Sequence, residues 1–283
     1  MAQQPLKKKD WEKDVVYLVQ YPRAVCLPNW CPFAVKLETW LRMADIKYEN
    51  LDCGLDVRSN KGQLPFIELN GNQIADSYFI VQELTRHFKK EDMESHLGAI
   101  EKGTCRAYCA LVEQSIFWAN YMVLIDHYKE LFEDKIMGKW YSSTQKFFKP
   151  FHDYRMLEHM KARVYNQGIG RHSLQEAESI GVKDLESLSA YLGKKTYFTG
   201  TKPTYLDALV FGHLAQIWYM PYESNLKNQI SEHNKNLGDF MERVKSTFWK
   251  DWEEVCAPAP PTAPTSPSVE AKPLQEGQNP TAT

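Results

Sequence analysis

The sequence predicts an α/β domain followed by an all-helical domain. Between residues 15 and 90, short β-branched and aromatic runs alternate with segments of helical periodicity, which is the pattern of an α/β unit. Beyond residue 95 strand signals nearly vanish and helical periodicity takes over. The chain has 283 residues, which is enough for two domains of ordinary size.

The α/β part begins with a strand, VVYLVQY at 15–21, whose β-branched and aromatic residues suit a buried position. A helix is predicted from about Pro32 to Ala44, because its apolar residues fall on one face at helical spacing. KYENL at 47–51 follows as a weaker second strand.

The next two strands are predicted to form a hairpin. PFIEL at 65–69 and NQI at 72–74 flank the pair Asn70-Gly71. A type I′ turn prefers this pair, since both of its central residues need positive φ.

A second helix is predicted from Asp76 or Ser77 to about Phe88. The resulting order of strands and helices describes a thioredoxin-like domain over residues 15–90. A charged arm, residues 1–14, precedes it.

The second domain is predicted over residues 95–252 and is all-helical. Its clearest start signal is Thr204 followed by Asp207, at the cap and third positions, where each can bond the other's backbone N–H. The predicted helices span 95–130, 140–166, 173–192, 204–219 and 234–248.

The last 27 residues, 257–283, have a different composition. They hold seven of the fifteen prolines and hardly an apolar side chain. Such a segment cannot bury enough surface to offset its ordering entropy, so we expect a disordered tail that serves as a tether or a docking segment.

Composition and charge exclude several classes of protein. The 34 basic and 36 acidic residues nearly balance, so there is no excess of positive charge that would attract a phosphate backbone. Nucleic acid is therefore not an expected partner. The charged start lacks the apolar region of a signal peptide, and no stretch is long enough for a transmembrane anchor. We therefore expect a cytoplasmic protein with reduced cysteines. None of the six cysteines has C-x-x-C spacing, so no metal site is predicted.

Three short strings, LPF at 64–66, ADS at 75–77 and TYLD at 204–207, resemble the glutathione S-transferase superfamily in order and spacing. This resemblance implies the glutathione-transferase fold, with glutathione as a co-substrate. A closer resemblance is to the failed-axon-connections and metaxin-like branch of that superfamily. It is carried by CPFAVKLETWLRMADIKYEN (31–50), GQLPFIELNGNQIADSYFIVQEL (62–84), NQGIGRHS (166–173) and LDALVFGHLAQ (206–216).

Cys31 departs from that branch, which more often has a Ser-Pro-Phe string. Its Cys-Pro-Phe-Ala string looks like those of omega-class transferases and glutaredoxins. Pro32 suits the first position of a helix and makes Cys31 the cap, where the helix dipole can lower the pKa of a thiol. The alternative is an inert, buried cysteine.

The resemblance also implies a glutathione site. A cis Pro65 would turn the backbone of Leu64 toward the cysteinyl part of glutathione. Asp76 and Ser77 would bind its γ-glutamyl carboxylate, or else only cap the helix. Tyr21 is a fallback activator of the glutathione thiol, or simply an aromatic residue of the strand.

Two classes of function follow from these expectations. The first is an enzyme, a thioltransferase in which Cys31 acts on a disulfide or electrophilic acceptor, or a transferase that activates bound glutathione directly. The second is a non-catalytic interaction protein, which the resemblance to failed-axon-connections proteins implies for axon development. A metaxin-like role in mitochondrial import is a third possibility. The superfamily is often dimeric, so a homodimer is a possible state of the chain.

Overall fold

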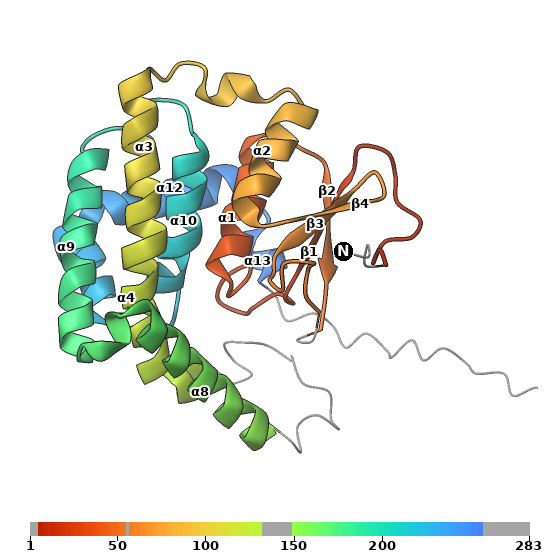
Figure 1. Ribbon diagram of the computed structural model, residues 1–283. Helices are drawn as coiled ribbons and strands as arrows, with labels where there is room; N and C mark the ends of the chain where they lie inside the picture. Colours follow the sequence, from red (N-terminus) through yellow and green to blue (C-terminus); the bar gives the residue numbers. More distant parts are fainter. Residues whose placement is uncertain (1–4, 55–56, 132–148, 257–283) are drawn as a thin grey trace, which may run out of the picture.

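The computed structural model describes residues 5–54, 57–131 and 149–256 (Figure 1). A small sheet with two helices lies beside a larger helical part, so the chain has the fold class that the sequence predicts. The expected disordered tail and the first nine residues of the helix expected at 140–166 lie outside the described residues.

The sheet has four strands in the order β2-β1-β3-β4. They are β1 (Val16–Gln20), β2 (Tyr48–Asp52), β3 (Phe66–Leu69) and β4 (Asn72–Ala75). Strand β1 pairs parallel with β2 and antiparallel with β3. A parallel pair needs a crossover connection, which α1 (Pro32–Met43) supplies.

The predicted hairpin between β3 and β4 is confirmed. Asn70 and Gly71 both have positive φ, 49° and 79°, as a type I′ turn requires. The ring of Trp11 packs over Gly71, where an added Cβ would lie 3.3 Å from a ring carbon. The N-terminal arm is therefore held against this end of the sheet.

One face of the sheet packs on α1 and α2 (Ser77–His87). The side chains that form this core are Val16, Leu18, Leu37, Trp40, Leu41, Ile67, Ile80 and Leu84. The arm makes a second contact with the sheet, because the backbone N–H groups of Lys7 and Lys8 donate to the buried Glu68 carboxylate at 2.8 and 2.9 Å.

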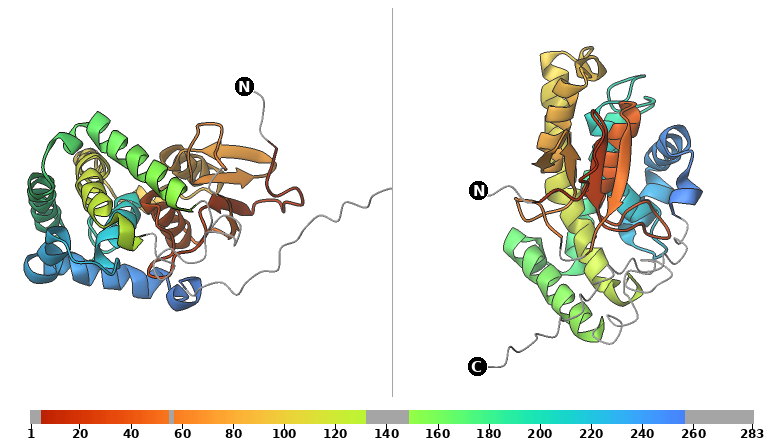
Figure 2. Two further views of the ribbon diagram at one scale, coloured as in Figure 1. Left: turned by 90° about the horizontal axis from the view of Figure 1, so that it is seen from below. Right: turned by 90° about the vertical axis from the view of Figure 1, so that its right-hand side faces the viewer.

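The helical part consists of several long helices and short turns. Its elements are η1 (Glu91–Glu94), α3 (Ala99–Leu111), η2 (Val112–Ile116), α4 (Phe117–Asp126), α5 (Tyr128–Leu131), α8 (Lys149–Gln167), η3 (Ile169–Arg171), α9 (Leu174–Leu192), α10 (Tyr205–Trp218), α11 (Asn225–Asn228), η4 (Gln229–His233), α12 (Lys235–Phe248) and α13 (Trp252–Val255). Both views in Figure 2 and the view in Figure 1 show α8 beside α4.

The prediction of one continuous helix over 95–130 is wrong in two respects. The helix starts at Ala99 and not at residue 95, after Gly98, whose N–H donates to the Glu101 carboxylate at 2.9 Å. A π-helical turn, η2, then interrupts the helix. Such a turn adds one residue to a helical turn and often marks a functional position.

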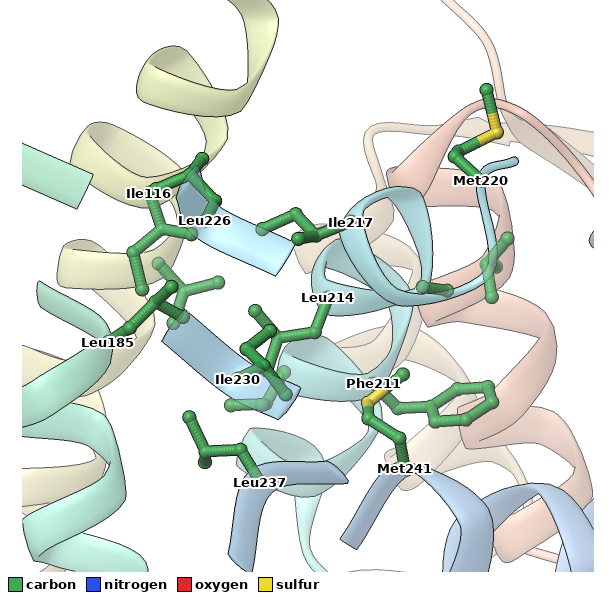
Figure 3. Packing of buried hydrophobic residues seen from close by; sticks show 14 of the residues in the cluster. Ile116, Leu185, Phe211, Leu214, Ile217, Met220, Leu226, Ile230, Leu237 and Met241 are labelled. Carbon is green, nitrogen blue, oxygen red and sulfur yellow. The ribbon is translucent and has the colours of Figure 1, made fainter. Parts of the chain in front are cut away.

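Helix α10 is the centre of the helical part, and every residue from Leu206 to Ile217 is buried. In Figure 3, Leu214 and Ile217 of this helix pack among Ile116, Leu185, Leu226, Ile230 and Leu237 of the surrounding elements. The carboxylate of Asp207 accepts hydrogen bonds from the Thr204 N–H and hydroxyl, both at 2.8 Å. This is the Asp207 half of the predicted capping box.

Helix α10 also contacts α1 at very short range. A Cβ added to Gly212 would lie 2.5 Å from the backbone nitrogen of Lys36 and 2.7 Å from the carbonyl oxygen of Pro32. Only glycine allows two helix backbones to approach this closely. The start of α1, and with it Cys31, is thereby fixed against the helical part.

Candidate functional site

Cys31 is the N-cap of α1, as the sequence predicts. Its backbone is extended, with φ −90° and ψ 113°, and its carbonyl oxygen accepts the first helical hydrogen bonds from Ala34 and Val35. Pro32 is the first helical residue. The thiol therefore lies at the end of the helix where backbone N–H groups have no helical partner.

Asn29, which the sequence analysis did not select, holds the backbone of Cys31. Its side-chain oxygen accepts from the Cys31 N–H at 2.9 Å, and its amide donates to the carbonyl of Tyr21 at 2.7 Å. Gln216 of α10 donates to the Asn29 carbonyl at 3.1 Å. An asparagine two residues before a helix cap is the available sequence signal for such a turn.

Opposing effects act on the pKa of the Cys31 thiol. Burial raises the pKa of the Cys31 thiol above its ordinary value. The backbone N–H groups of Ala34 and Phe33 oppose this effect, as do the charges of Lys36 and Arg163. The helix N-terminus does favour the thiolate, but loss of water around the sulfur outweighs it.

The predicted cis peptide bond between Leu64 and Pro65 is confirmed. Pro65 is buried immediately before β3, and Leu64 is half-buried against a small cluster that includes Val19 and Phe66.

Asp76 is the N-cap of α2 and has an unusual φ of 80°. Its carboxylate accepts from the N–H of Tyr78 at 3.0 Å, so the capping role is present. Ser77 is the first helical residue and is 8% exposed. Within residues 5–54, 57–131 and 149–256, no group forms a hydrogen bond with its hydroxyl. The hydroxyl remains available at a helix N-terminus, where anions bind readily.

Tyr21 follows β1 and is half-buried. Burial raises the pKa of its phenol, the charge of Arg58 opposes this, and Cys31 adds to it. Tyr21 is thus within electrostatic range of Cys31.

Cys26 packs against Met220. Its sulfur lies 3.6 Å from that of Met220, after the end of α10, and burial raises its pKa to about 11. None of the six cysteines, all of which lie in the described ranges, forms a disulfide bond in the structure.

Three aromatic rings of α4 contact one another, and one of them also contacts Phe33 in the first turn of α1. We call Phe117, Trp118 and Tyr121 the aromatic wall. Phe33 contacts Phe117 with ring centroids 5.4 Å apart. The three wall residues contact one another at 4.9 to 5.8 Å.

Arg163 of α8 covers the far end of the aromatic wall. Its guanidinium carbon lies 5.6 Å from the ring centre of Trp118 and 5.3 Å from that of Tyr121. Arg163 could not be predicted as a site residue, because nothing in the local sequence connects it with Cys31.

Two absences hold for the residues that the structure describes. There is no group of three or more histidine, cysteine or carboxylate residues that could hold a metal ion. The same ranges contain no helix long and apolar enough to cross a membrane.

Two family models match this chain. One, described as a glutathione S-transferase N-terminal domain, matches residues 32–131, and the other, described as a glutathione S-transferase C-terminal domain, matches residues 181–244. The chain belongs to the glutathione S-transferase superfamily. Cys31 lies one residue before the region that matches the transferase N-terminal domain.

Among individual relatives of this transferase-family chain, Failed axon connections of Drosophila melanogaster is 34% identical over 264 residues. That alignment covers 88% of the chain but only 62% of the Drosophila protein. Metaxin-2 of Mus musculus is 24% identical over 201 residues, covering 69% of the chain and 73% of metaxin-2. Isoprene-epoxide–glutathione S-transferase of Rhodococcus is 23% identical over 246 residues, covering 81% of the chain and 97% of that enzyme.

Solved structures of glutathione S-transferases share the fold. The enzyme GSTFuA3 of Phanerochaete chrysosporium has a TM-score of 0.58 and 13% identity, covering 83% of the chain and 98% of that structure. A transferase of Methylobacterium radiotolerans, in complex with glutathione sulfonate, has a TM-score of 0.54 and 14% identity, covering 89% of the chain and 99% of that structure.

Proposed function

We propose that this chain binds glutathione at Leu64, Pro65, Asp76 and Ser77 and that Cys31 exchanges it as a mixed disulfide. The supporting observation is the position of the Cys31 thiol at the start of α1, where the N–H groups of Phe33 and Ala34 favour its anion. The hydroxyl of Ser77, which has no hydrogen-bond partner among the described residues, lies at a second helix N-terminus and suits the γ-glutamyl carboxylate.

The proposed reaction is a thioltransferase exchange. The Cys31 thiol first loses its proton to solvent. The resulting thiolate then attacks the glutathione sulfur of a disulfide that contains glutathione. A bond forms between the two sulfurs, the original disulfide bond breaks, and the other half leaves as a thiolate. A second glutathione thiolate then attacks the glutathione sulfur of the mixed disulfide, so that glutathione disulfide forms and Cys31 leaves as a thiolate.

A second candidate is a non-catalytic interaction protein that acts in axon development. Two observations favour it. One is the 34% identity with Failed axon connections, of which this chain spans 62%. The other is the raised pKa of Cys31, which leaves less thiolate at neutral pH. A metaxin-like role in mitochondrial import has only the weaker identity with metaxin-2 in its support.

Intact-protein mass spectrometry tests the two candidates. The chain and its Cys31→Ser variant are exposed to glutathione disulfide between pH 6 and 9.5. The thioltransferase proposal expects one adduct that the variant lacks and that reduced glutathione removes. Ser77→Ala should slow its formation, whereas Ser95→Ala, at an exposed serine outside the site, should not. No adduct at Cys31 would leave the interaction protein as the proposed function.

We propose the cytoplasm as the place of this chemistry, because thiols are kept reduced there and the exchange needs a reduced Cys31. A homodimer remains a prediction from the superfamily, and light scattering during size-exclusion chromatography tests it.

A further inference from the structure

Arg163 is an exposed cation that two aromatic rings hold in place. Besides the contacts with Trp118 and Tyr121, its guanidinium donates to the Tyr121 hydroxyl at 3.4 Å. In the part of the chain that the structure describes, no carboxylate pairs with Arg163. Its position is fixed by stacking while its charge is free to meet an anion.

Continuous ring contacts connect this arginine with the candidate nucleophile. Phe33, two residues after Cys31, packs against Phe117, which in turn packs against Trp118 and Tyr121. Cys31 and Arg163 both affect the pKa of the Tyr121 phenol. Tyr121 is therefore within electrostatic range of both the thiol and the guanidinium. It belongs to α4, beside which α8 runs (Figures 1 and 2).

These features match one kind of molecule. An aromatic or apolar body can pack on Trp118 and Tyr121, and a carboxylate or sulfonate can pair with Arg163. We propose that the acceptor in the Cys31 exchange is an aromatic disulfide or electrophile that carries a negative charge, with Arg163 as its binding residue. This inference rests on the function proposed above, since it names the substrate class of the same site.

Two disulfide probes of similar shape separate the effect of charge. The probes are 5,5′-dithiobis(2-nitrobenzoate), which carries carboxylates, and the neutral 4,4′-dithiodipyridine. In each case the Cys31 thiolate forms a mixed disulfide with one half of the probe, and the other half leaves as a coloured thiolate or thione. Rates measured on Cys31→Ser are subtracted to remove the contribution of the other five cysteines to the reaction.

The informative quantity is the ratio of the Cys31 rate constants for the anionic and the neutral probe. Arg163→Gln should lower this ratio about threefold, the effect of one partly exposed ion pair. High salt should lower it in the parent chain and not in the variant. The matched control is Arg155→Gln on the same helix, whose guanidinium stacks on Phe151 instead, and it should leave the ratio unchanged.

Three results would overturn the inference. In the first, Arg163→Gln slows both probes equally, so that Arg163 acts only on the thiolate and not on the acceptor. In the second, Arg155→Gln lowers the ratio as much as Arg163→Gln, so that the effect is one of general charge. In the third, Cys31 reacts with neither probe, which would end the thioltransferase proposal as well.

Discussion

The ammonium nitrogen of Lys36 lies 2.7 Å from the carboxylate of Glu113, across the boundary between the sheet-bearing and helical parts. Lys36 belongs to α1 and its side chain is 1% exposed, whereas Glu113 belongs to the π-helical turn η2 and is 21% exposed. The ammonium group also donates to the Tyr205 hydroxyl at 3.2 Å. A buried cation thus depends on a partly exposed anion.

This asymmetry predicts unequal effects of removing the two partners. Glu113→Ala should lower the free energy of unfolding by about 3 kcal/mol, because it leaves the buried ammonium unpaired. Lys36→Met should lower it by about 1 kcal/mol, since water can reach the remaining carboxylate. Urea unfolding of both variants measures the difference, and an equal or reversed order would contradict the explanation.

Gly212→Ala should lower the free energy of unfolding by about 3 kcal/mol or more, because its Cβ would meet the backbone of α1 and not a flexible side chain. Gly103→Ala, on the exposed side of α3 with nothing within 4 Å of the new Cβ, is the matched control. It should stabilise the chain by about 0.5 to 1 kcal/mol through helix propensity. Thermal and urea unfolding together test the pair, and a neutral Gly212→Ala would refute the close contact of the two helices.

The alkylation rate of Cys31 should keep rising above pH 8.5, since burial raises the pKa of this thiol. Arg163→Gln should shift the profile to still higher pH, because the arginine charge acts to lower that pKa. Peptide mass spectrometry after iodoacetamide pulses between pH 6 and 10 gives the profile. A plateau reached below pH 8 would show that the helix N-terminus dominates over burial.

His213 should make the chain less stable in mild acid. Burial lowers the pKa of this histidine to about 4, and the charge of Lys36 contributes. The unfolded chain takes up the proton near pH 6.5, so stability is lost as the pH falls from about 6.5 toward 4, by at most about 3 kcal/mol.

The free energy of unfolding is measured against pH for the parent chain and for His213→Gln, and the difference between the two isolates this effect. Asp207 acts in the opposite direction, since burial raises its pKa to about 6 and stability is lost as the pH rises through that value. Its contribution is common to both chains and cancels in the difference between their unfolding free energies. If the two curves of free energy against pH run parallel from pH 4 to 7, His213 is not the group responsible.

The elements with local signals could be predicted from the sequence. Asn70-Gly71 determines its turn through two backbone angles, and Pro32 marks the start of its helix through the absence of an N–H group. The cis bond at Pro65 needed the family resemblance, because X–Pro bonds in general are rarely cis.

The parts that depend on distant contacts could not be predicted. Helical periodicity over 95–130 does not reveal the extra residue of η2, since the break is small and its partner, Lys36, is far away in the sequence. Arg163 reaches the site only through tertiary packing. The balance between the helix N-terminus and burial at Cys31 could not be predicted for the same reason, because water exclusion around the sulfur is decided by the whole fold.

The end of the described chain packs on the first helix. Arg42 of α1 pairs with Asp251 at 2.5 Å and stacks on Trp249, whose indole N–H donates to Thr39 at 3.1 Å. During synthesis on the ribosome, the sheet-bearing part therefore emerges without the residues that cover the outer face of its own helix. This half of the molecule can reach its final form only after Trp249 and Asp251 have been made, so a nascent-chain truncation before Trp249 should leave it open to chaperones and proteases.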